Sequence, residues 1–235
     1  MSENTGLLAG FAKIDITPDF VTGLGGYSNA ESRLAKGVAE PIYTTCIALT
    51  DGDETILVYT IDNCACPHAV AEWIRERVTE ATGIAGEKIF CSATHSHNCP
   101  SFWAYPTVEQ YRELFLNACV EAAKKALEDR APATTMAAKK QFPNMNFVRH
   151  VELANGVTAG YDWSRHKSPI LGWAGHADDM MVLVKFAREE KKDILLINWQ
   201  GHPDCSTDIG FELIAPSYVG PLRDTVAVGA GMEVA

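Results

Sequence analysis

The order strand, helix, strand between residues 55 and 91 most constrains what this chain can fold into. Residues 55–61 form an apolar, β-branched run, and residues 89–91 form a second, shorter one. Between them, residues 68–82 carry apolar side chains at helical spacing, namely Val70, Trp73, Ile74 and Val78. A helix that connects two strands in this way predicts a βαβ-like crossover, in which both strands lie parallel in one sheet.

Further strands and a second helix surround this crossover along the chain. Residues 42–50 precede the first run and are joined to it through Asp51 and Gly52, a pair typical of a hairpin turn. The spacing over residues 108–127 predicts a helix, and residues 180–186 and 194–199 predict another pair of strands. No internal repeat, low-complexity tract or linker interrupts the sequence. We therefore expect a single α/β domain over residues 1–235, with a mixed β-sheet core and flanking helices.

Charge and composition exclude some classes of protein. The formal net charge of −10, without a cluster of lysine or arginine, argues against nucleic-acid binding. No apolar run is long enough to be a transmembrane segment, and the first residues lack the features of a signal peptide. Seven cysteines, an odd number, favour a reducing compartment, so we expect a cytoplasmic protein. Cys64 and Cys66 lack the two-residue gap of common metal and redox motifs, and we assign them a structural role.

Two histidines follow the second strand of the crossover. If the chain is still extended there, alternation sends the side chains of His95 and His97 to the same side. Two neutral imidazoles on one side of a strand end can form half of a zinc site. An isolated His-x-His pattern fits hydrogen bonding within a loop about equally well. A further histidine, His202, ends another apolar run that begins at residue 194.

An acidic residue, Asp62, stands at the end of the first strand of the crossover. Polar residues at strand ends line the ligand crevice in many α/β sheets. A residue that caps a helix or a turn occupies the same kind of position, and we weigh the two interpretations equally.

Three motifs occur in an order that resembles one known family. They are Asp-Ile-Thr-Pro at residues 15–18 followed by Gly26 and Tyr27, Ala-Thr-His-Ser-His-Asn-Cys-Pro at residues 93–100, and Asn-Trp-Gln-Gly-His at residues 198–202. Together they resemble the N-terminal catalytic domain of the neutral/alkaline, non-lysosomal ceramidases, which are zinc-dependent amidases. In that family the second motif reads roughly Thr/His-Thr-His-Ser-Gly-Pro, and the third reads Asn-Trp-Phe-x-x-His. The match extends over most of the chain, and its specificity lies in the combination of motifs.

The resemblance implies roles for five residues. His95 and His202 match the two zinc-binding histidines, and His97 matches the histidine placed near the scissile bond. Arg149 falls where the family has an arginine that contacts the substrate or the developing oxyanion. Asp62 falls at the aspartate after the early strand, and we assign it to substrate binding. The cofactor that the resemblance implies is Zn²⁺.

Two departures from the family pattern bear on the site. Asn98 and Cys99 stand where the family has Ser-Gly, which removes a flexible residue. The family completes its zinc shell with a glutamate and a tyrosine from much later in the chain, and no residue up to Ala235 matches them. We therefore expect either the N-terminal domain of a longer protein or a site in which acids such as Asp62 or Asp204 replace these ligands.

The activity that the resemblance implies is hydrolysis of an amide bond by metal-activated water. The substrate would be an N-acyl compound, either a lipid such as ceramide or a smaller soluble molecule. His97 would transfer a proton to the leaving amine, and Arg149 would stabilise the oxyanion. Two alternatives stay open: a non-catalytic domain with an incomplete metal shell and a binding role, and a metal-dependent esterase or phosphoesterase that uses the same histidines.

Overall fold

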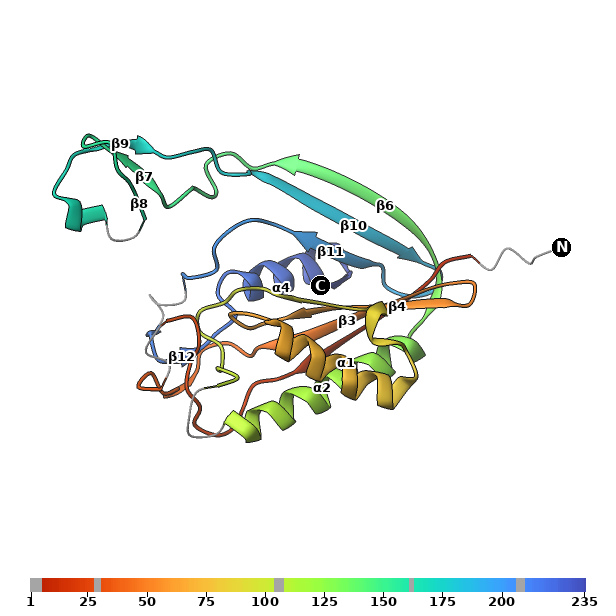
Figure 1. Cartoon of the computed structure of the whole chain (residues 1–235). Coiled ribbons are helices and arrows are strands. Elements are labelled where there is room, and N and C mark those ends of the chain that lie inside the picture. The colour runs from red at the N-terminus through yellow and green to blue at the C-terminus, as the bar shows by residue number, and fades with distance from the viewer. Residues whose placement is uncertain (1–5, 28–30, 104–107, 161–162, 206–209) are drawn as a thin grey trace. The chain divides into compact units, whose positions relative to one another are not determined.

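The structure is a computed structural model that describes residues 6–27, 31–103, 108–160, 163–205 and 210–235. Its main feature is a mixed sheet with the strand order β13-β11-β10-β6-β1-β3-β4-β5 (Figure 1). In chain order these strands are β1 (Leu8–Asp15), β3 (Tyr43–Asp51), β4 (Glu54–Ile61), β5 (Ile89–Ala93), β6 (Ala131–Gln141), β10 (Met180–Arg188), β11 (Ile194–Asn198) and β13 (Glu233–Val234). The predicted α/β class with a mixed sheet and flanking helices is confirmed.

The shorter elements complete the fold. The α-helices are α1 (His68–Thr82), α2 (Val108–Glu128) and α4 (Val219–Ala230), and the 3₁₀ turns are η1 (Gly86–Lys88) and η2 (Trp163–His166). Strands β2 (Gly37–Val38) and β12 (Leu213–Ile214) form a two-stranded sheet. Strands β7 (Val151–Leu153), β8 (Thr158–Ala159) and β9 (Ile170–Trp173) form a three-stranded sheet. Among the described residues, no helix combines the length and the apolar character that crossing a membrane requires.

The predicted crossover is confirmed. Strand β4 pairs with β5 in parallel, and α1 connects them. Helix α1 ends at Gly83, whose φ of 76° is left-handed and whose N–H donates to the carbonyl of Thr79. Strands β3 and β4 form the predicted antiparallel hairpin, in which Gly52 has a positive φ of 56°. This crossover brings the ends of β4 and β5 together, and the candidate site begins there.

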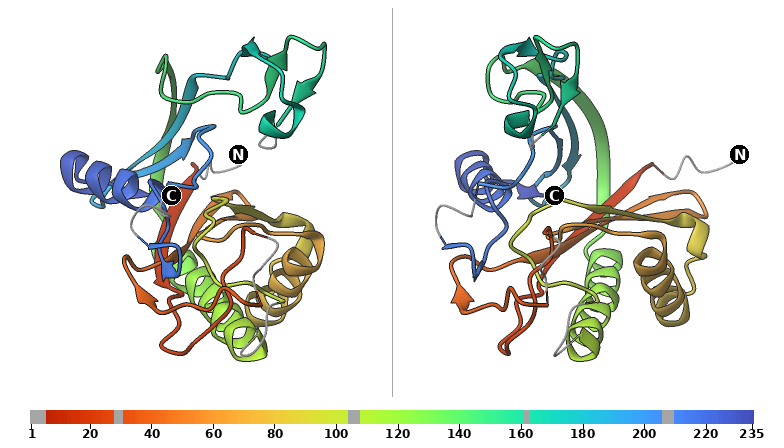
Figure 2. Two further views of the ribbon diagram at one scale, coloured as in Figure 1. Left: turned by 90° about the vertical axis from the view of Figure 1, so that its left-hand side faces the viewer. Right: turned by 60° about the vertical axis from the view of Figure 1, so that its left-hand side comes forward.

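Alternation along the central strands produces two apolar layers. On one face, Ala12, Cys46 and Tyr59 pack against α1 and α2, which lie side by side below the sheet (Figure 1). On the other face, Phe11 and Ile47 pack against side chains of β10 and β11. Helix α4 also lies on the side of the sheet away from α1 and α2 (Figure 2). The apolar residues whose spacing predicted these strands and helices therefore lie on the buried faces of the elements.

One glycine sets the distance between α2 and the sheet. A Cβ atom at Gly10 on β1 would lie 2.0 Å from the carbonyl oxygen of Ala126 on α2. Because that contact is with backbone, no side-chain rotation could relieve it. Gly10 thus allows the C-terminal turn of α2 to approach β1 closely.

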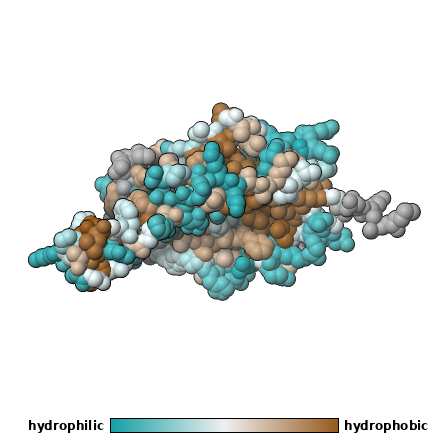
Figure 3. Space-filling view, turned by 90° about the horizontal axis from the view of Figure 1, so that it is seen from above, coloured by the Kyte–Doolittle hydropathy of each residue, from teal (hydrophilic) through white to brown (hydrophobic). Residues whose placement is uncertain are grey.

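The described residues form two compact units. The first contains the described residues within 1–136, 184–196 and 203–235, and the second contains those within 137–183 and 197–202. The second unit holds the β8-β7-β9 sheet with a small core of Val151, Leu153 and Ala159. Its surface is partly apolar, since Phe147 and Trp173 stack with ring centroids 5.1 Å apart while both are more than half exposed. Figure 3 shows apolar side chains of this unit bordered by hydrophilic ones.

Candidate metal centre

His95 begins the candidate site, two residues after β5 ends. The N–H of Thr94 donates to the carbonyl of Ile61, and that of His95 donates to the carbonyl of Asn63, each at 2.9 Å. The backbone of His95 is left-handed, with a φ of 69°. The chain is therefore not extended at His95, and strand alternation does not apply there, because the backbone turns instead of continuing the pleat. The turn still brings His95 and His97 together, with ring centroids 4.9 Å apart and planes at 88°.

A backbone carbonyl favours one tautomer of the neutral His95 ring. The carbonyl oxygen of Cys64 lies within hydrogen-bonding distance of His95 Nδ1. A carbonyl oxygen can only accept, so Nδ1 carries the proton and Nε2 carries the lone pair. Nε2 lies 3.4 Å from Nε2 of His97.

The ring of His97 is held in a buried position by a glycine and a tyrosine. His97 is 8% exposed. Gly26 has a φ of 99°, and a Cβ atom there would lie 2.6 Å from Cγ of His97. Beside it, the ring of Tyr27 meets that of His97 edge to face, with centroids 5.1 Å apart. Gly26 thus has a structural reason, because only glycine leaves room for the imidazole of His97. Tyr27 has another, since its ring packs against that imidazole.

Asp204 lies on the other side of His97. Its Oδ1 atom is 3.7 Å from Nδ1 of His97 and accepts a hydrogen bond from the hydroxyl of Tyr27. Burial, and then the carboxylate of Asp204, raise the pKa of Tyr27 to about 12. Tyr27 therefore stays protonated at neutral pH and continues to donate to Asp204. This arrangement places one acid, which the sequence suggested as a replacement ligand, directly beside the histidine pair.

Arg33 joins the loops that carry these residues. It is 2% exposed and donates to the carbonyls of Gly25, His97 and Phe211 and to the side-chain oxygen of Asn98, all within 2.7–2.9 Å. Burial lowers the pKa of Arg33, yet an arginine keeps its charge at neutral pH. Asn98 also donates to the carbonyls of Gly210 and Leu213. The departure from Ser-Gly at Asn98 thus supplies a buried cross-link between three segments.

Cys64 completes a group of three donors at this point of the first unit. The sulfur of Cys64 and one nitrogen from each of His95 and His97 lie within 4.8 Å of one another. Cys64 is half-buried, and burial, with the Asp204 charge, raises the pKa of its thiol. A thiol and two imidazoles are the donor types that zinc prefers over magnesium or calcium. The residues present therefore fit the metal that the resemblance implies.

The structure also describes the other predicted site residues, each in its own surroundings. Asp62 is fully buried and forms an ion pair with Arg223 of α4, with Oδ2 and Nη2 2.6 Å apart. Arg149 is an exposed residue of the second unit. His202 is exposed, ends the second unit and precedes Asp204 by two residues. The first unit thus brings together His95 and His97, and the sequence reasoning did not identify their neighbours Tyr27, Arg33 and Cys64 as part of this cluster.

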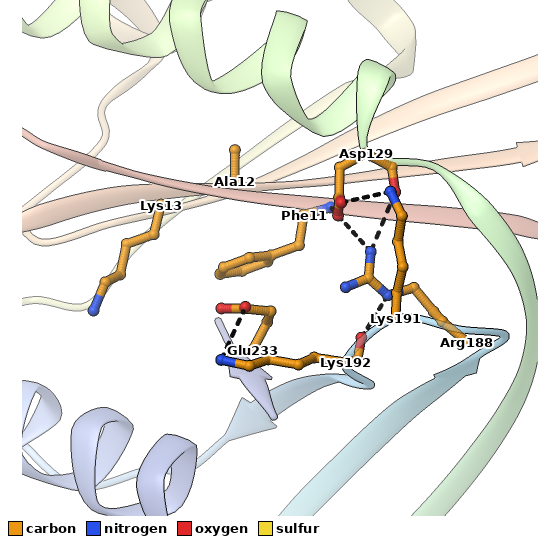
Figure 4. A pocket seen from close by; sticks show the side chains of 8 residues that line it. All are labelled: Phe11, Ala12, Lys13, Asp129, Arg188, Lys191, Lys192 and Glu233. Atoms are coloured by element: carbon orange, nitrogen blue, oxygen red, sulfur yellow. Dashed lines mark hydrogen bonds and ion pairs between the residues drawn. The ribbon is translucent and has the colours of Figure 1, made fainter. Parts of the chain in front are cut away.

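A cavity of about 400 Å³ lies apart from the histidines in the first unit (Figure 4). It is lined by Phe11, Ala12, Lys13, Asp129, Arg188, Lys191, Lys192 and Glu233. Its charged groups are engaged in ion pairs, in which Asp129 meets Arg188 and Lys191 and Glu233 meets Lys192. None of the histidines is among the residues that line this cavity.

Comparison with known proteins identifies a similar fold. No family model and no curated protein sequence matches the chain. Two solved structures match with a TM-score of 0.73 and 18% identity: a ceramidase complexed with C2 and the neutral ceramidase from Pseudomonas aeruginosa. The matches cover 98% and 99% of this chain but 37% and 38% of those chains, so it spans a little over a third of their length. The chain thus has a fold similar to that of part of the neutral ceramidases.

Proposed function

We propose that this protein is a zinc-dependent hydrolase that cleaves the amide bond of an N-acyl substrate such as ceramide. The observation that carries the proposal is the histidine pair, in which the Cys64 carbonyl holds the neutral His95 ring in the tautomer with its lone pair on Nε2, and Nε2 of the buried His97 lies 3.4 Å away. The similarity in fold to two ceramidases supports it. We also propose a cytoplasmic location, from the odd number of cysteines.

In this proposal His95 holds the ion through Nε2, and His202 is the second histidine ligand. Bound zinc supplies a water molecule whose pKa falls from about 15.7 toward about 7, and it polarises the carbonyl of the substrate. The Cys64 carbonyl keeps the His95 ring in the tautomer that leaves Nε2 able to bind a cation. His202 enters through the resemblance, and the metal content of a variant can test it directly.

His97 is the proposed proton donor to the leaving amine. Its ring is fixed by Gly26, Tyr27 and Asp204, so its orientation does not have to be established when substrate binds. The two Nε2 atoms lie 3.4 Å apart, and this spacing supports the proposal that His97 acts on a substrate held by an ion on His95. Arg149 is the proposed oxyanion contact. The geometry of Asp62 favours an anchoring role over the substrate-binding role that the resemblance implies.

The substrate class follows from the similar proteins and from the site. One of the two solved structures is a ceramidase complexed with C2, and we extend the N-acyl lipid class to this chain as part of the proposal. The histidine pair lies beside the half-buried side chains of Tyr27, Cys64 and Asp204. A neutral amide fits a position next to the Asp204 carboxylate better than an anionic phosphoester, which the carboxylate would repel.

The test compares zinc content and turnover of a short-chain N-acyl sphingosine in four variants. His95→Ala and His202→Ala are expected to lose both bound zinc and activity. His97→Ala is expected to keep zinc while kcat falls by about 10²–10⁴-fold, the usual contribution of a general acid. His68→Ala is the matched control, since the His68 side chain is 87% exposed on α1. Faster turnover of a matched ester than of the amide would replace the proposal with an esterase, and zinc binding without any turnover would favour a binding domain.

A further inference from the structure

Two of the seven cysteines meet near the start of α1. Cys66 lies two residues before the helix, and Cys91 lies in the middle of β5, where it pairs with Tyr59 of β4. Both side chains are half-buried and pack against the same apolar cluster between the sheet and the helices. Their thiol groups share a hydrogen bond. The crossover therefore brings two free thiols into contact, although the whole of α1 separates them in sequence.

The side chain of Arg75 on α1 lies close to both thiols. Its Nε atom donates to the carbonyl of Ile89 at 3.3 Å, and Ile89 and Cys91 lie on the same face of β5. Its Nη1 atom pairs with Glu72 of the same helix at 2.6 Å. A fixed guanidinium group thus lies beside the two sulfur atoms, where its charge favours a thiolate over a thiol.

The two thiols differ in how readily they lose a proton. The hydrogen bond from Cys91 lowers the pKa of Cys66, burial opposes this effect, and the charge of Arg75 adds to it. The same hydrogen bond, together with burial, raises the pKa of Cys91. Cys66 is therefore the sulfur that becomes a thiolate, and Cys91 keeps its proton and donates it to Cys66.

The other five cysteines have different surroundings, and all seven lie in the described part of the chain. Cys66 combines partial exposure, a lowered pKa and a neighbouring thiol, which are the features of a redox-sensing cysteine with a resolving partner. The sulfur of the exposed Cys205 lies 3.1 Å from a serine hydroxyl. Burial raises the pKa of the other four, which are Cys46, Cys64, Cys99 and Cys119.

We propose that Cys66 and Cys91 form a reversible disulfide in the presence of a peroxide, with Cys66 as the reacting thiol and Cys91 as the resolving thiol. The Cys66 thiolate attacks one oxygen of hydrogen peroxide, the O–O bond breaks, and a sulfenic acid and a hydroxide ion form. The sulfur of Cys91 then attacks the sulfur of the sulfenic acid, whose hydroxyl group leaves. The protons of the two thiols convert both hydroxyl groups to water, so one peroxide is reduced as two thiols are oxidised. An added dithiol reverses the reaction by exchange.

This oxidation requires neither a metal ion nor the proposed hydrolase. It suits a reducing compartment, in which disulfides are transient and often sense oxidants. The disulfide would join two segments that flank the histidine pair. The carbonyls of Asn63 and Cys64, just before Cys66, accept from the backbone N–H and the ring of His95, and Cys91 lies on the strand that leads to His95. Oxidation thus ties the segment that holds His95 to the strand that precedes it.

The test treats the reduced full chain with hydrogen peroxide and maps disulfides by mass spectrometry of unreduced peptides. A link between Cys66 and Cys91 is expected in the unmutated chain, and dithiothreitol is expected to remove it. Cys66→Ser and Cys91→Ser should each lose the link. Cys64→Ser is the matched control, two residues away and half-buried like Cys66, and it should keep the link.

Dimedone, a reagent that traps sulfenic acids, identifies which thiol reacts first. In Cys91→Ser the sulfenic acid at Cys66 has no resolving partner, so a dimedone adduct at Cys66 is expected to accumulate. The unmutated chain should form little adduct, because Cys91 removes the sulfenic acid. In Cys66→Ser no adduct is expected at Cys91.

A measurement on the unmutated chain does not depend on the folding of a variant. Peroxide is expected to abolish alkylation of Cys66 and Cys91 by iodoacetamide, and dithiothreitol is expected to restore it. Cys64 is the internal reference and should be alkylated to the same extent before and after peroxide.

The outcomes that would overturn the inference are equally specific. A link from Cys64 to Cys91, a link that persists in Cys66→Ser, or irreversible oxidation of Cys66 without any link would each refute the pair. An adduct at Cys91 in Cys66→Ser, with none at Cys66 in Cys91→Ser, would refute the assigned roles. None of these measurements involves zinc or amide turnover, so failure of the proposed hydrolase and failure of this inference are distinguishable.

Discussion

The carboxylate of Asp62 is fully buried, and both of its oxygens accept hydrogen bonds. Arg223 donates to them at 3.3 and 2.6 Å, and the N–H of Tyr43 donates at 2.9 Å. Burial opposes the charge of Arg223, but the Asp62 carboxylate outweighs it and the pKa of Arg223 is raised. Removing one member of such a pair leaves the other charge buried without compensation. The pair therefore connects the end of β4 to α4.

At the residue scale, we expect Asp62→Asn to destabilise the fold by about 3–5 kcal/mol, the usual cost of breaking a buried ion pair from one side. Urea denaturation measures the change. The double variant Asp62→Asn/Arg223→Met removes both charges and is expected to recover part of the lost stability. Unchanged stability together with a raised KM would instead assign Asp62 to substrate binding.

Asp129, directly after α2, connects three elements of the first unit. Its carboxylate accepts from the N–H of Phe11 on β1, and from Arg188 and Lys191 at the turn between β10 and β11. Lys191 and Arg188 also donate to the Asp129 carbonyl at the end of α2, where cations stabilise the helix dipole. Burial acts to raise the pKa of Asp129, but these hydrogen bonds outweigh it and lower the pKa from 3.8. Figure 4 shows these side chains converging on Asp129.

At the element scale, Asp129→Asn is expected to lower stability by about 1.5–3 kcal/mol at neutral pH, the range for hydrogen bonds to a charged group. Because the folded pKa lies below the unfolded value, the contribution is complete above the unfolded pKa and disappears as pH falls through the folded pKa. Denaturation should thus show a large difference in the free energy of unfolding between variant and parent at about pH 7. The difference should be smaller at about pH 3. Glu190→Gln, at an exposed acid in the same turn, is the control, and an equal difference at both pH values would contradict the interpretation.

The whole molecule carries 30 acidic and 20 basic residues, for a net charge of −10. Such a surface attracts any divalent cation weakly, so loose association with metal says little about a specific site. Thiol and imidazole donors distinguish zinc from magnesium, which prefers oxygen ligands and retains its waters. A preference for zinc over magnesium would therefore indicate a specific metal centre, whereas equal binding of both ions would indicate attraction to the acidic surface.

At the molecular scale, zinc at 100 times its dissociation constant is expected to stabilise the folded state by about 2.7 kcal/mol. Thermal unfolding monitored by fluorescence measures the shift, and His95→Ala should abolish it. Magnesium at the same concentration is the control and should leave Tm unchanged. An equal shift with both ions would mean that the acidic surface, and not the histidine site, binds them.

The sequence by itself determined the elements whose signal is local. The hairpin of β3 and β4, helix α1 and the parallel strand β5 are each visible in the spacing of apolar residues, because periods of two and 3.6 are set by backbone geometry. The histidine pair was also predicted, although the left-handed backbone of His95 brings the two rings together by a turn and not by alternation. The two-residue spacing of His95 and His97 thus predicted that their rings would meet, although the backbone conformation between them differs from a strand.

Only the tertiary structure decided the partners of the polar residues in the loops at the strand ends. Asp62 meets Arg223 across 161 residues, Tyr27 meets Asp204 across 177, and Arg33 reaches Phe211 across 178. No local period relates such residues, since their approach depends on how separate loops close over the ends of the strands. A half-buried cysteine beside a histidine has no sequence signature of its own for the same reason. The chemistry of this site is therefore set by long-range contacts, which the pattern of a single segment does not encode.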